Sequence, residues 1–342
     1  MSVDESQYIS RIAEVLRSQI HDQNVVNSLA NQVYRGVTEG LELETLTFDE
    51  WFDNRFKYQL VWLTKDDYVK ALTNALWLAP VFAGTDFGSS RQRDMAQVWT
   101  DTARGFLGEI ALSRFLSDKF GARVKTDFRR GELEEFLPSD ITGIMLPDSG
   151  WIEPRLKLSI KTTKFNGRWL DAPGAQLEHS DVFVLVKIGI MRHHFLAFLK
   201  AISFLKDKLF PSAADLGVLN SEQAEQLWNE LPTFDPIPAY IAGYIKKDEL
   251  NLPIHMLNAK LRGRKTKRIV ISQGIGLFSK ESLRSNAVIQ QLDPEGNLDI
   301  EIEPIIDSLT GQHFLAHSGG LKYGKHNWRR IIGMLSGRNA PQ

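Results

Sequence analysis

The chain has 342 residues, of which 43% are hydrophobic and 24% charged, and it contains no cysteine. This composition is typical of a folded globular protein and excludes intrinsic disorder and a coiled coil, while the length allows two domains or one elaborated domain. The absence of cysteine excludes disulfides, thiolate zinc sites and cysteine nucleophiles, so a metal ion would need oxygen or imidazole ligands.

The first residues, MSVDESQYIS, lack the basic and apolar start of a signal peptide, and the most apolar stretch, ALWLAPVFAG, is too short to span a bilayer. We therefore expect a cytoplasmic protein without membrane contact. The net charge of −1 is unevenly distributed, because residues 1–100 contain 14 acidic and nine basic residues, whereas residues 246–268 contain eight basic and two acidic ones. The latter segment is either a solvated loop or a phosphate-binding surface.

Residues 1–100 show helical spacing of apolar side chains, as in Ile9, Ile12 and Leu16, and predict a helical N-terminal region. A second region, 101–250, begins with a helix over 102–120 that Gly121 ends. A β-hairpin over 138–161 follows, then strands at 179–190 and 193–202, a helical insert near 205–232 and a short strand at 238–245.

The last region, 251–342, combines a strand (KRIVIS), a helix over 279–292 and a glycine-rich end with basic and aromatic residues. Residues 272–278, SQGIGLF, predict a turn, because the third glycine and the lysine of a phosphate-binding loop are missing. The predicted fold class is α/β, with a mixed central sheet flanked by helices, a helical N-terminal region and an α+β C-terminal part that contacts DNA or a second subunit.

The hairpin brings two charged residues together. Pairing around a turn at Asp148 and Ser149 places residue 157 opposite Asp140, and Lys157, Ser159 and Lys161 then share its polar face. Asp140 and Lys161 should therefore converge at one end of the hairpin. A surface ion pair is the simplest reading of such a pair.

The order of a helix with Glu109, a hairpin with Asp140, a strand with Lys161 and a buried strand resembles the PD-(D/E)XK nuclease superfamily, the fold of most type II restriction endonucleases. PSD at 138–140 is similar to its proline-aspartate element, and SIK at 159–161 to its acid-x-lysine element. The similarity covers residues 100–250, and its motifs are short.

This resemblance implies a Mg²⁺-dependent hydrolysis of phosphodiester bonds. Asp140 would be the central metal ligand and the carbonyl of Ile160 would complete the shell, because Mg²⁺ prefers hard oxygen ligands. Lys161 would orient the attacking water and offset the charge that develops in the transition state.

Ser159 stands where the superfamily has its second acid, so another carboxylate must supply the missing charge. Some restriction enzymes with this serine carry the glutamate on a helix after the lysine, and Glu178 is the matching residue here. Glu109, acting through water, is the second candidate. For each glutamate, an exposed position on a helix surface is as good an explanation as a role in metal binding.

Two histidine pairs are weaker candidates for metal sites. His193 and His194, adjacent in a predicted strand, should point to opposite faces and cannot chelate one ion. His313 and His317 have helical spacing, but the intervening glutamate of a metalloprotease is missing and SGG would end the helix. We expect no zinc site at either pair.

Basic residues in three segments are expected to contact double-stranded DNA. They are Lys164 and Arg168 after the lysine strand, Arg262, Arg264, Lys265, Lys267 and Arg268 in the basic segment, and Lys325 and Arg329 near the C-terminus. An amphipathic helix packing Trp328, Ile331 and Ile332 is an equal alternative for the last segment.

The resemblance as a whole implies an endodeoxyribonuclease, most simply a type II restriction enzyme acting as a homodimer on a symmetric site, with a cognate DNA methyltransferase in the same cell. Two alternatives stay open. One is a repair, transposition or junction-resolving nuclease of the same fold. The other is a non-catalytic DNA-binding protein whose nuclease site has degenerated, a reading that Ser159 supports.

Overall fold

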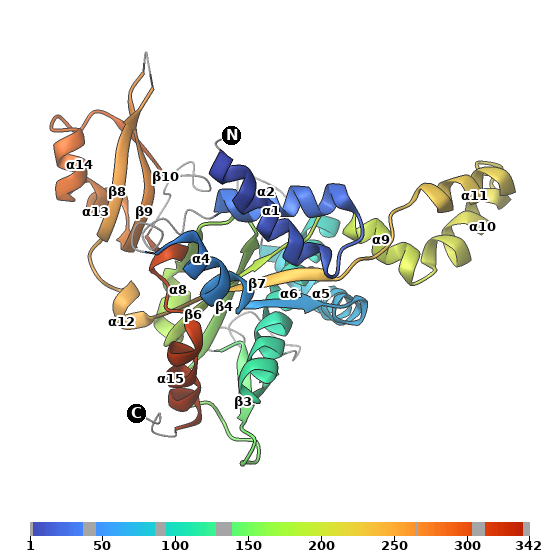
Figure 1. Ribbon diagram of the computed structural model, residues 1–342, viewed down its shortest axis with the longest axis horizontal. Coiled ribbons are helices and arrows are strands. Elements are labelled where there is room, and N and C mark those ends of the chain that lie inside the picture. Colours follow the sequence, from blue (N-terminus) through green and yellow to red (C-terminus); the bar gives the residue numbers. More distant parts are fainter. Residues whose placement is uncertain are drawn as a thin grey trace.

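The computed structural model describes residues 3–36, 46–85, 94–127, 139–263, 266–302 and 312–337. It has a mixed α/β architecture in which helices surround two mixed sheets (Figure 1). The predicted α/β class is confirmed at this level. Among the described helices, none combines the length and apolarity needed to cross a bilayer.

A four-stranded sheet forms the centre of the molecule. Its order is β1 (Leu60–Leu63), β7 (Ile237–Lys246), β6 (Val182–Ile188) and β4 (Leu158–Lys164). The β4 and β6 strands run parallel, whereas β7 is antiparallel to both of its neighbours. The N-terminal region thus contributes an outer strand, β1, to this sheet.

The central strand β6 is buried on both faces, as its continuous apolar sequence predicts. Val182, Val184 and Val186 pack in one core with helices α5 (Lys65–Thr85), α6 (Met95–Phe120) and α15 (Gly324–Ser336). Phe183 and Leu185 point the other way, into a core shared with the N-terminal helices. The alternation follows from the two-residue period of a strand.

The N-terminal helices and a second sheet cover that other face. The helices are α1 (Val3–Arg17), α2 (Gln23–Gly36), α4 (Phe48–Trp51) and the π-helix η1 (Phe52–Lys57). The second sheet has the order β10 (Asp299–Ile302), β9 (Arg268–Phe278), β11 (His313–His317) and β5 (Trp169–Pro173), with β8 (His255–Arg262) also paired to β9. The chain therefore enters this sheet at β5, directly after β4.

Shorter elements complete the fold. A two-stranded sheet pairs β2 (Arg123–Thr126) with β3 (Ile141–Met145). The short helices are α8 (Gly174–His179), α9 (His194–Ala201), α12 (Lys247–Leu250), α13 (Lys280–Arg284), α14 (Ala287–Leu292) and the 3-10 turn η3 (Ser318–Gly320). The predicted helical insert forms an arm made of η2 (Leu205–Leu209), α10 (Phe210–Asp215) and α11 (Ser221–Glu230), which extends from the body in Figure 1.

Several predicted elements are confirmed. The helix before the hairpin ends at Gly121, whose φ of 65° is the left-handed conformation that glycine adopts at a helix C-terminus. Helix α15 is amphipathic and buries Trp328, Ile331 and Ile332, so the packing alternative for the C-terminal segment is correct. Its basic residues Lys325 and Arg329 remain exposed.

Four local predictions are wrong. Residues 194–201 form helix α9 and not a strand, and the rings of His193 and His194 stack with centroids 5.1 Å apart. SQGIGLF lies inside β9, where pairing with β11 outweighs the turn preference of its glycines. His313 and His317 belong to β11 and not to a helix, and the helix predicted over 279–292 is divided into α13 and α14.

The histidines have separate structural roles. Burial, together with the neighbouring His193, lowers the pKa of His194 to about 4, and its Nδ1 accepts a 2.7 Å hydrogen bond from Met191 N–H. His317 is buried with its ring 5.3 Å from that of Trp169. Both side chains are therefore enclosed in the fold, and the lowered pKa keeps His194 neutral near pH 7.

Helix α6 lies against β4 at a glycine. A Cβ atom at Gly108 would lie 2.1 Å from Oγ1 of Thr162 in β4, whereas a Cβ atom at Gly105, one turn earlier, would meet no atom within 4 Å. Gly108 therefore sets how closely α6 approaches the strand that carries Lys161, and it also directly precedes Glu109.

We expect Gly108→Ala to lower the free energy of unfolding by about 1–3 kcal/mol, because the helix would have to move away from β4. Gly105→Ala is the matched control in the same helix and should be neutral or stabilising by up to about 1 kcal/mol, since alanine is the better helix former. Urea denaturation measures both changes. Equal effects of the two substitutions would contradict this account of the contact.

Candidate functional site

Asp140 lies beside the outer edge of β4. Its backbone N–H donates to the carbonyl of Leu158 over 2.9 Å, and its Oδ2 accepts from the N–H of Ile160 over 2.5 Å. The predicted pairing of the two hairpin strands is wrong, because β3 pairs with β2 and β4 pairs with β6. The two segments instead meet at an isolated bridge between Ile144 and Ile152 and at the hydrogen bond from Asp140 to Leu158. Burial raises the pKa of the Asp140 carboxyl, against the lowering effects of the Ile160 N–H and the Lys161 charge.

Lys161 in β4 approaches this carboxylate. Its ammonium donates to the side-chain carbonyl of Gln176 in α8, and the negative charges of Asp140 and Asp171 act on it. Burial nevertheless lowers the pKa of Lys161, because desolvation of the ammonium exceeds these attractions. Asp140 and Lys161 thus lie near enough for each charge to act on the other at half-buried positions, although no ion pair joins these two described residues.

Glu109 in α6 brings a second carboxylate to Asp140. Burial raises the pKa of Glu109 well above its usual value, and the charges of Asp140 and Asp127 raise it further. Its Oε2 atom is buried and makes no hydrogen bond within the described structure. A buried carboxylate oxygen without a donor is costly, and a bound cation would compensate that cost.

Glu178 takes a different position. It lies in α8, its side chain is exposed, and its backbone carbonyl accepts a hydrogen bond from Lys247. Within the described residues, no hydrogen bond or ion pair links its carboxylate to Asp140 or Lys161. The side chain of α8 that contacts Lys161 is that of Gln176, two residues before Glu178.

Ser159 and Ile160 lie in β4 between these groups. Ser159 is buried and paired with Phe183 of β6, so the hydroxyl occupies a space enclosed by the sheet. Ile160 contacts Asp140 through its N–H, whereas the sequence predicted a role for its carbonyl. The N–H holds the orientation of the Asp140 carboxylate.

Sequence reasoning missed three polar residues around the site. Asp127 follows β2 and donates its backbone N–H to the carbonyl of Asp140 over 3.0 Å. Asp171 in β5 acts on Lys161 and accepts from Nδ1 of His313 over 3.2 Å. The sequence pattern that could have indicated Asp127 is its place at the end of a short alternating segment, RVKTD. No such pattern marks Asp171 or Gln176.

The carboxylate oxygens of Asp140 and Glu109 are hard ligands of the kind that Mg²⁺ prefers. Two half-buried carboxylates with raised pKa values, one with an unsatisfied oxygen, would both be favoured in their ionised forms by a divalent cation. In the part of the chain described, no three or more His, Asp or Glu side chains are grouped closely enough to hold an ion. A Mg²⁺ ion with one or two protein carboxylates keeps several waters, so Asp140 and Glu109 are the residues that would hold it.

The basic segment forms an exposed hairpin at another end of the molecule. Arg262 at the end of β8 and Lys267 before β9 are exposed, and Arg268 makes a 3.0 Å ion pair with Glu301. Arg264 and Lys265 lie outside the described residues, as does Pro138 of the proline-aspartate element. Arg262 and Lys267 are therefore exposed to solvent, and Arg268 has an acidic neighbour in Glu301.

The other predicted DNA-contacting residues are distributed around the core. Lys164 is exposed at the end of β4, and Arg168, just before β5, is half-buried. Lys325 and Arg329 are exposed on α15. Lys164 is the closest of these four in sequence to the Asp140 and Lys161 pair.

Comparison of the chain with protein-family models, with curated proteins and with solved structures found no match.

Proposed function

We propose that the protein is a Mg²⁺-dependent DNA endonuclease of the PD-(D/E)XK type, most simply a type II restriction enzyme. The observation that carries the proposal is the buried Glu109 oxygen without a donor, on a carboxylate near Asp140, whose own charge interacts with Lys161. The order of elements supports it, since α6, the β2 and β3 pair, β4, α8 and the parallel strand β6 follow one another as the resemblance implies.

In this proposal Asp140 and Glu109 hold the Mg²⁺ ion, which would polarise the phosphoryl oxygen and lower the pKa of a bound water. Glu109 takes the role that the sequence assigned to Glu178, because it is the carboxylate that acts on Asp140. Lys161 carries its proton and positive charge next to the scissile phosphate, where Gln176 and Asp171 keep the ammonium oriented. Ser159 adds no charge to the site.

Plasmid and phage DNA without methylation, incubated with the protein and either Mg²⁺ or EDTA, tests the proposal. We expect discrete fragments that require Mg²⁺. Random or junction-dependent cleavage would favour a repair, transposition or junction-resolving nuclease of the same fold. Binding without cleavage over a range of divalent ions would favour the non-catalytic DNA-binding protein. A cognate methyltransferase in the same cell and a cytoplasmic location belong to the restriction-enzyme proposal.

We also expect the β8–β9 hairpin to contact phosphates. Arg262→Ala combined with Lys267→Ala should flatten the slope of log K against log salt by about two units, because each lost phosphate contact removes roughly 0.9 of a unit. The double variant Lys65→Ala with Lys70→Ala, which removes two exposed cations from α5, is the control. Arg268→Ala should change the slope less, since Glu301 already offsets its charge. Fluorescence anisotropy with a short duplex measures all three, and equal slopes would exclude the hairpin from the interface.

A further inference from the structure

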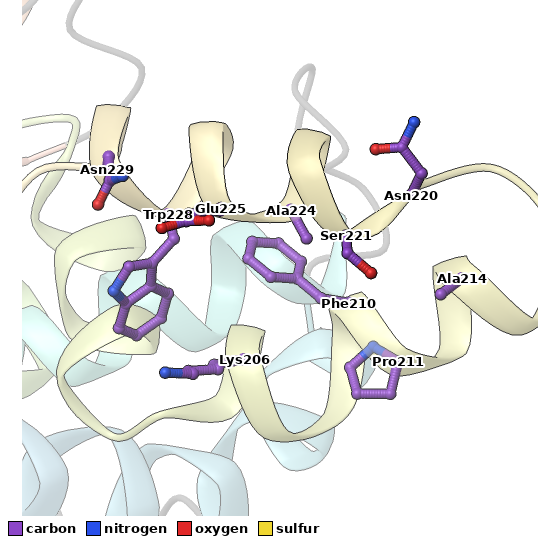
Figure 2. A pocket seen from close by; sticks show the side chains of 10 residues that line it. All are labelled: Lys206, Phe210, Pro211, Ala214, Asn220, Ser221, Ala224, Glu225, Trp228 and Asn229. Carbon is purple, nitrogen blue, oxygen red and sulfur yellow. The ribbon is translucent and has the colours of Figure 1, made fainter.

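Two elements project from the body of the molecule, and their charges differ in sign. The arm, over residues 203–232, contains five acidic and two basic residues, and its cavity of about 450 Å³ is lined by the rings of Phe210 and Trp228 (Figure 2). The ribbon formed by β8 and β9 (Figure 1) belongs to a stretch, residues 251–280, with seven basic residues and no acidic one. A polyanion would therefore be repelled by the arm and attracted to the ribbon.

The two faces of the ribbon have different surroundings. Leu257 and Ala259 of β8 pack against a core that includes Ile289 of α14. Because side chains alternate along a strand, Asn258 and Lys260 point to the opposite face, and both are exposed. The ribbon thus has one face closed by helices and one polar face open to solvent.

A β-bulge positions Asn258 on the open face. It pairs with Gln273, whereas Ala259 pairs with Ile271, so Ser272 is an additional residue of β9. The Ser272 hydroxyl donates to the carbonyl of Asn258 over 3.3 Å, and Nδ2 of Asn258 donates to Oε1 of the buried Gln273 over 3.4 Å. Bulges redirect side chains and increase the twist of a ribbon. The Asn258 amide is therefore oriented, and its carbonyl oxygen and second N–H are left for a ligand.

Lys260 lies two residues farther along the same face. No ion pair holds it within the described residues, and the acids Asp299 and Glu301 belong to β10, on the edge of β9 away from β8. A strand rises about 3.4 Å per residue, so about 7 Å along β8 separates Asn258 from Lys260, the distance of two base-pair steps in a duplex. The positive charge of this sheet is therefore concentrated on β8 and at the tip of the ribbon.

From this arrangement we infer that the ribbon enters the major groove of duplex DNA, where Asn258 and Lys260 contact base edges and determine which sequence is bound. The major groove admits a two-stranded β-ribbon, and there asparagine pairs with N6 and N7 of adenine and lysine with O6 and N7 of guanine. Arg262 and Lys267 would contact the phosphates beside them. The inference rests on the proposed function for its ligand, a DNA duplex, but its readout is binding and not cleavage.

Selection of DNA by the full-length protein in EDTA, where Mg²⁺-dependent cleavage cannot occur, tests the inference. The probe is a pool of short duplexes with a randomised centre, and affinity for the selected duplex is compared with that for a scrambled one. Asn258→Ala and Lys260→Ala should each weaken binding to the selected duplex about tenfold to a hundredfold, as loss of a bidentate base contact does. Affinity for the scrambled duplex should change far less. Lys280→Ala, which removes an exposed lysine at the start of α13, is the control and should alter neither affinity.

Base analogues identify the groove that is read. Replacing purines of the selected duplex by their 7-deaza analogues removes the N7 acceptor from the major groove. This change should weaken binding of the wild type but add little to the effect of Asn258→Ala or Lys260→Ala at the base that each residue contacts, because the two changes remove the same interaction. Inosine in place of guanine removes an amino group from the minor groove and should have no effect.

Several outcomes would overturn the inference. Equal losses on both duplexes would show that Asn258 and Lys260 contact only phosphates, and an effect of inosine alone would place the ribbon in the minor groove. Absence of DNA binding, or tighter binding of duplex RNA, whose narrow major groove excludes a ribbon, would also contradict it. Circular dichroism checks that the variants are folded.

The inference and the proposed nuclease can fail separately. Sequence-selective binding that depends on Asn258 and Lys260, without cleavage in Mg²⁺, would retain the ribbon as the reading element and remove the nuclease. Mg²⁺-dependent cleavage that Asn258→Ala and Lys260→Ala leave unchanged in rate and in sequence would retain the nuclease and overturn the inference.

Discussion

Asp140→Asn should reduce DNA cleavage on the order of a thousandfold while DNA affinity stays within about tenfold. The amide keeps an oxygen that can accept from Ile160 N–H, so the local structure is retained, but it removes the negative charge that a divalent ion requires. Lys161→Ala should have a comparable effect, because the transition state loses its nearest cation. Single-turnover cleavage of a labelled duplex, with anisotropy for binding, separates the two quantities.

The control substitutions for these variants lie in the segment between β3 and β4. Asp148→Ala removes an exposed acid at the turn, and Lys157→Ala removes an exposed lysine before β4. Both should cleave at nearly the wild-type rate. Cleavage by Asp140→Asn or by Lys161→Ala at that rate would show that the enclosed pair is structural, and the non-catalytic reading would then be the better one.

Glu109→Gln should reduce cleavage by about a hundredfold or more, whereas Glu178→Ala should leave it almost unchanged. The reason is positional, since Glu109 acts on Asp140 with a buried, unpartnered oxygen and Glu178 is exposed on α8. Loss of a metal ligand lowers the rate through weaker Mg²⁺ binding, so raised Mg²⁺ should partly restore the Glu109→Gln activity. The reverse ranking of the two variants would return the second ligand to Glu178.

Glu109→Gln should raise the stability of the metal-free protein, although it lowers the cleavage rate. The raised pKa of Glu109 means that the folded, metal-free protein favours its protonated form, so the stability from this group is complete below the usual pKa of 4.5 and is lost as pH rises through the folded-state value. Glu109→Gln has no such loss. In EDTA its midpoint of thermal unfolding should exceed that of the wild type, and the difference should grow with pH. A difference independent of pH would show that folding does not raise the pKa of Glu109.

The central strand, the helix that ends at Gly121 and the amphipathic C-terminal helix were predictable because each depends on local periodicity or on one capping residue. The conformations of residues 194–201 and of SQGIGLF were not predictable, because neighbouring strands and helices determine them. Tertiary pairing outweighed the local turn preference of glycine at 274 and 276.

The site divides in the same way. Asp140 and Lys161 were selected from the alternation of residues along the predicted hairpin, which is a short-range regularity of the sequence. Asp171 and Gln176 were not, because they reach Lys161 only after the chain has passed into a second sheet and a short helix. The sequence favoured Glu178 over Glu109, because it shows neither that Glu178 is exposed on α8 nor that α6 lies against β4 at Gly108, next to Glu109.

The passage of the chain from β4 to β5 links two parts of the molecule mechanically. Only residues 165–168 separate the strand of Lys161 from the strand of Asp171, and Phe165 among them is buried. The β5 strand is held by β11, which in turn pairs with β9 of the basic hairpin. In the proposed nuclease, a duplex bound by that hairpin would exert a force that passes through two rows of backbone hydrogen bonds to Asp171, whose charge acts on Lys161. The sheet would then couple DNA binding to the alignment of the lysine.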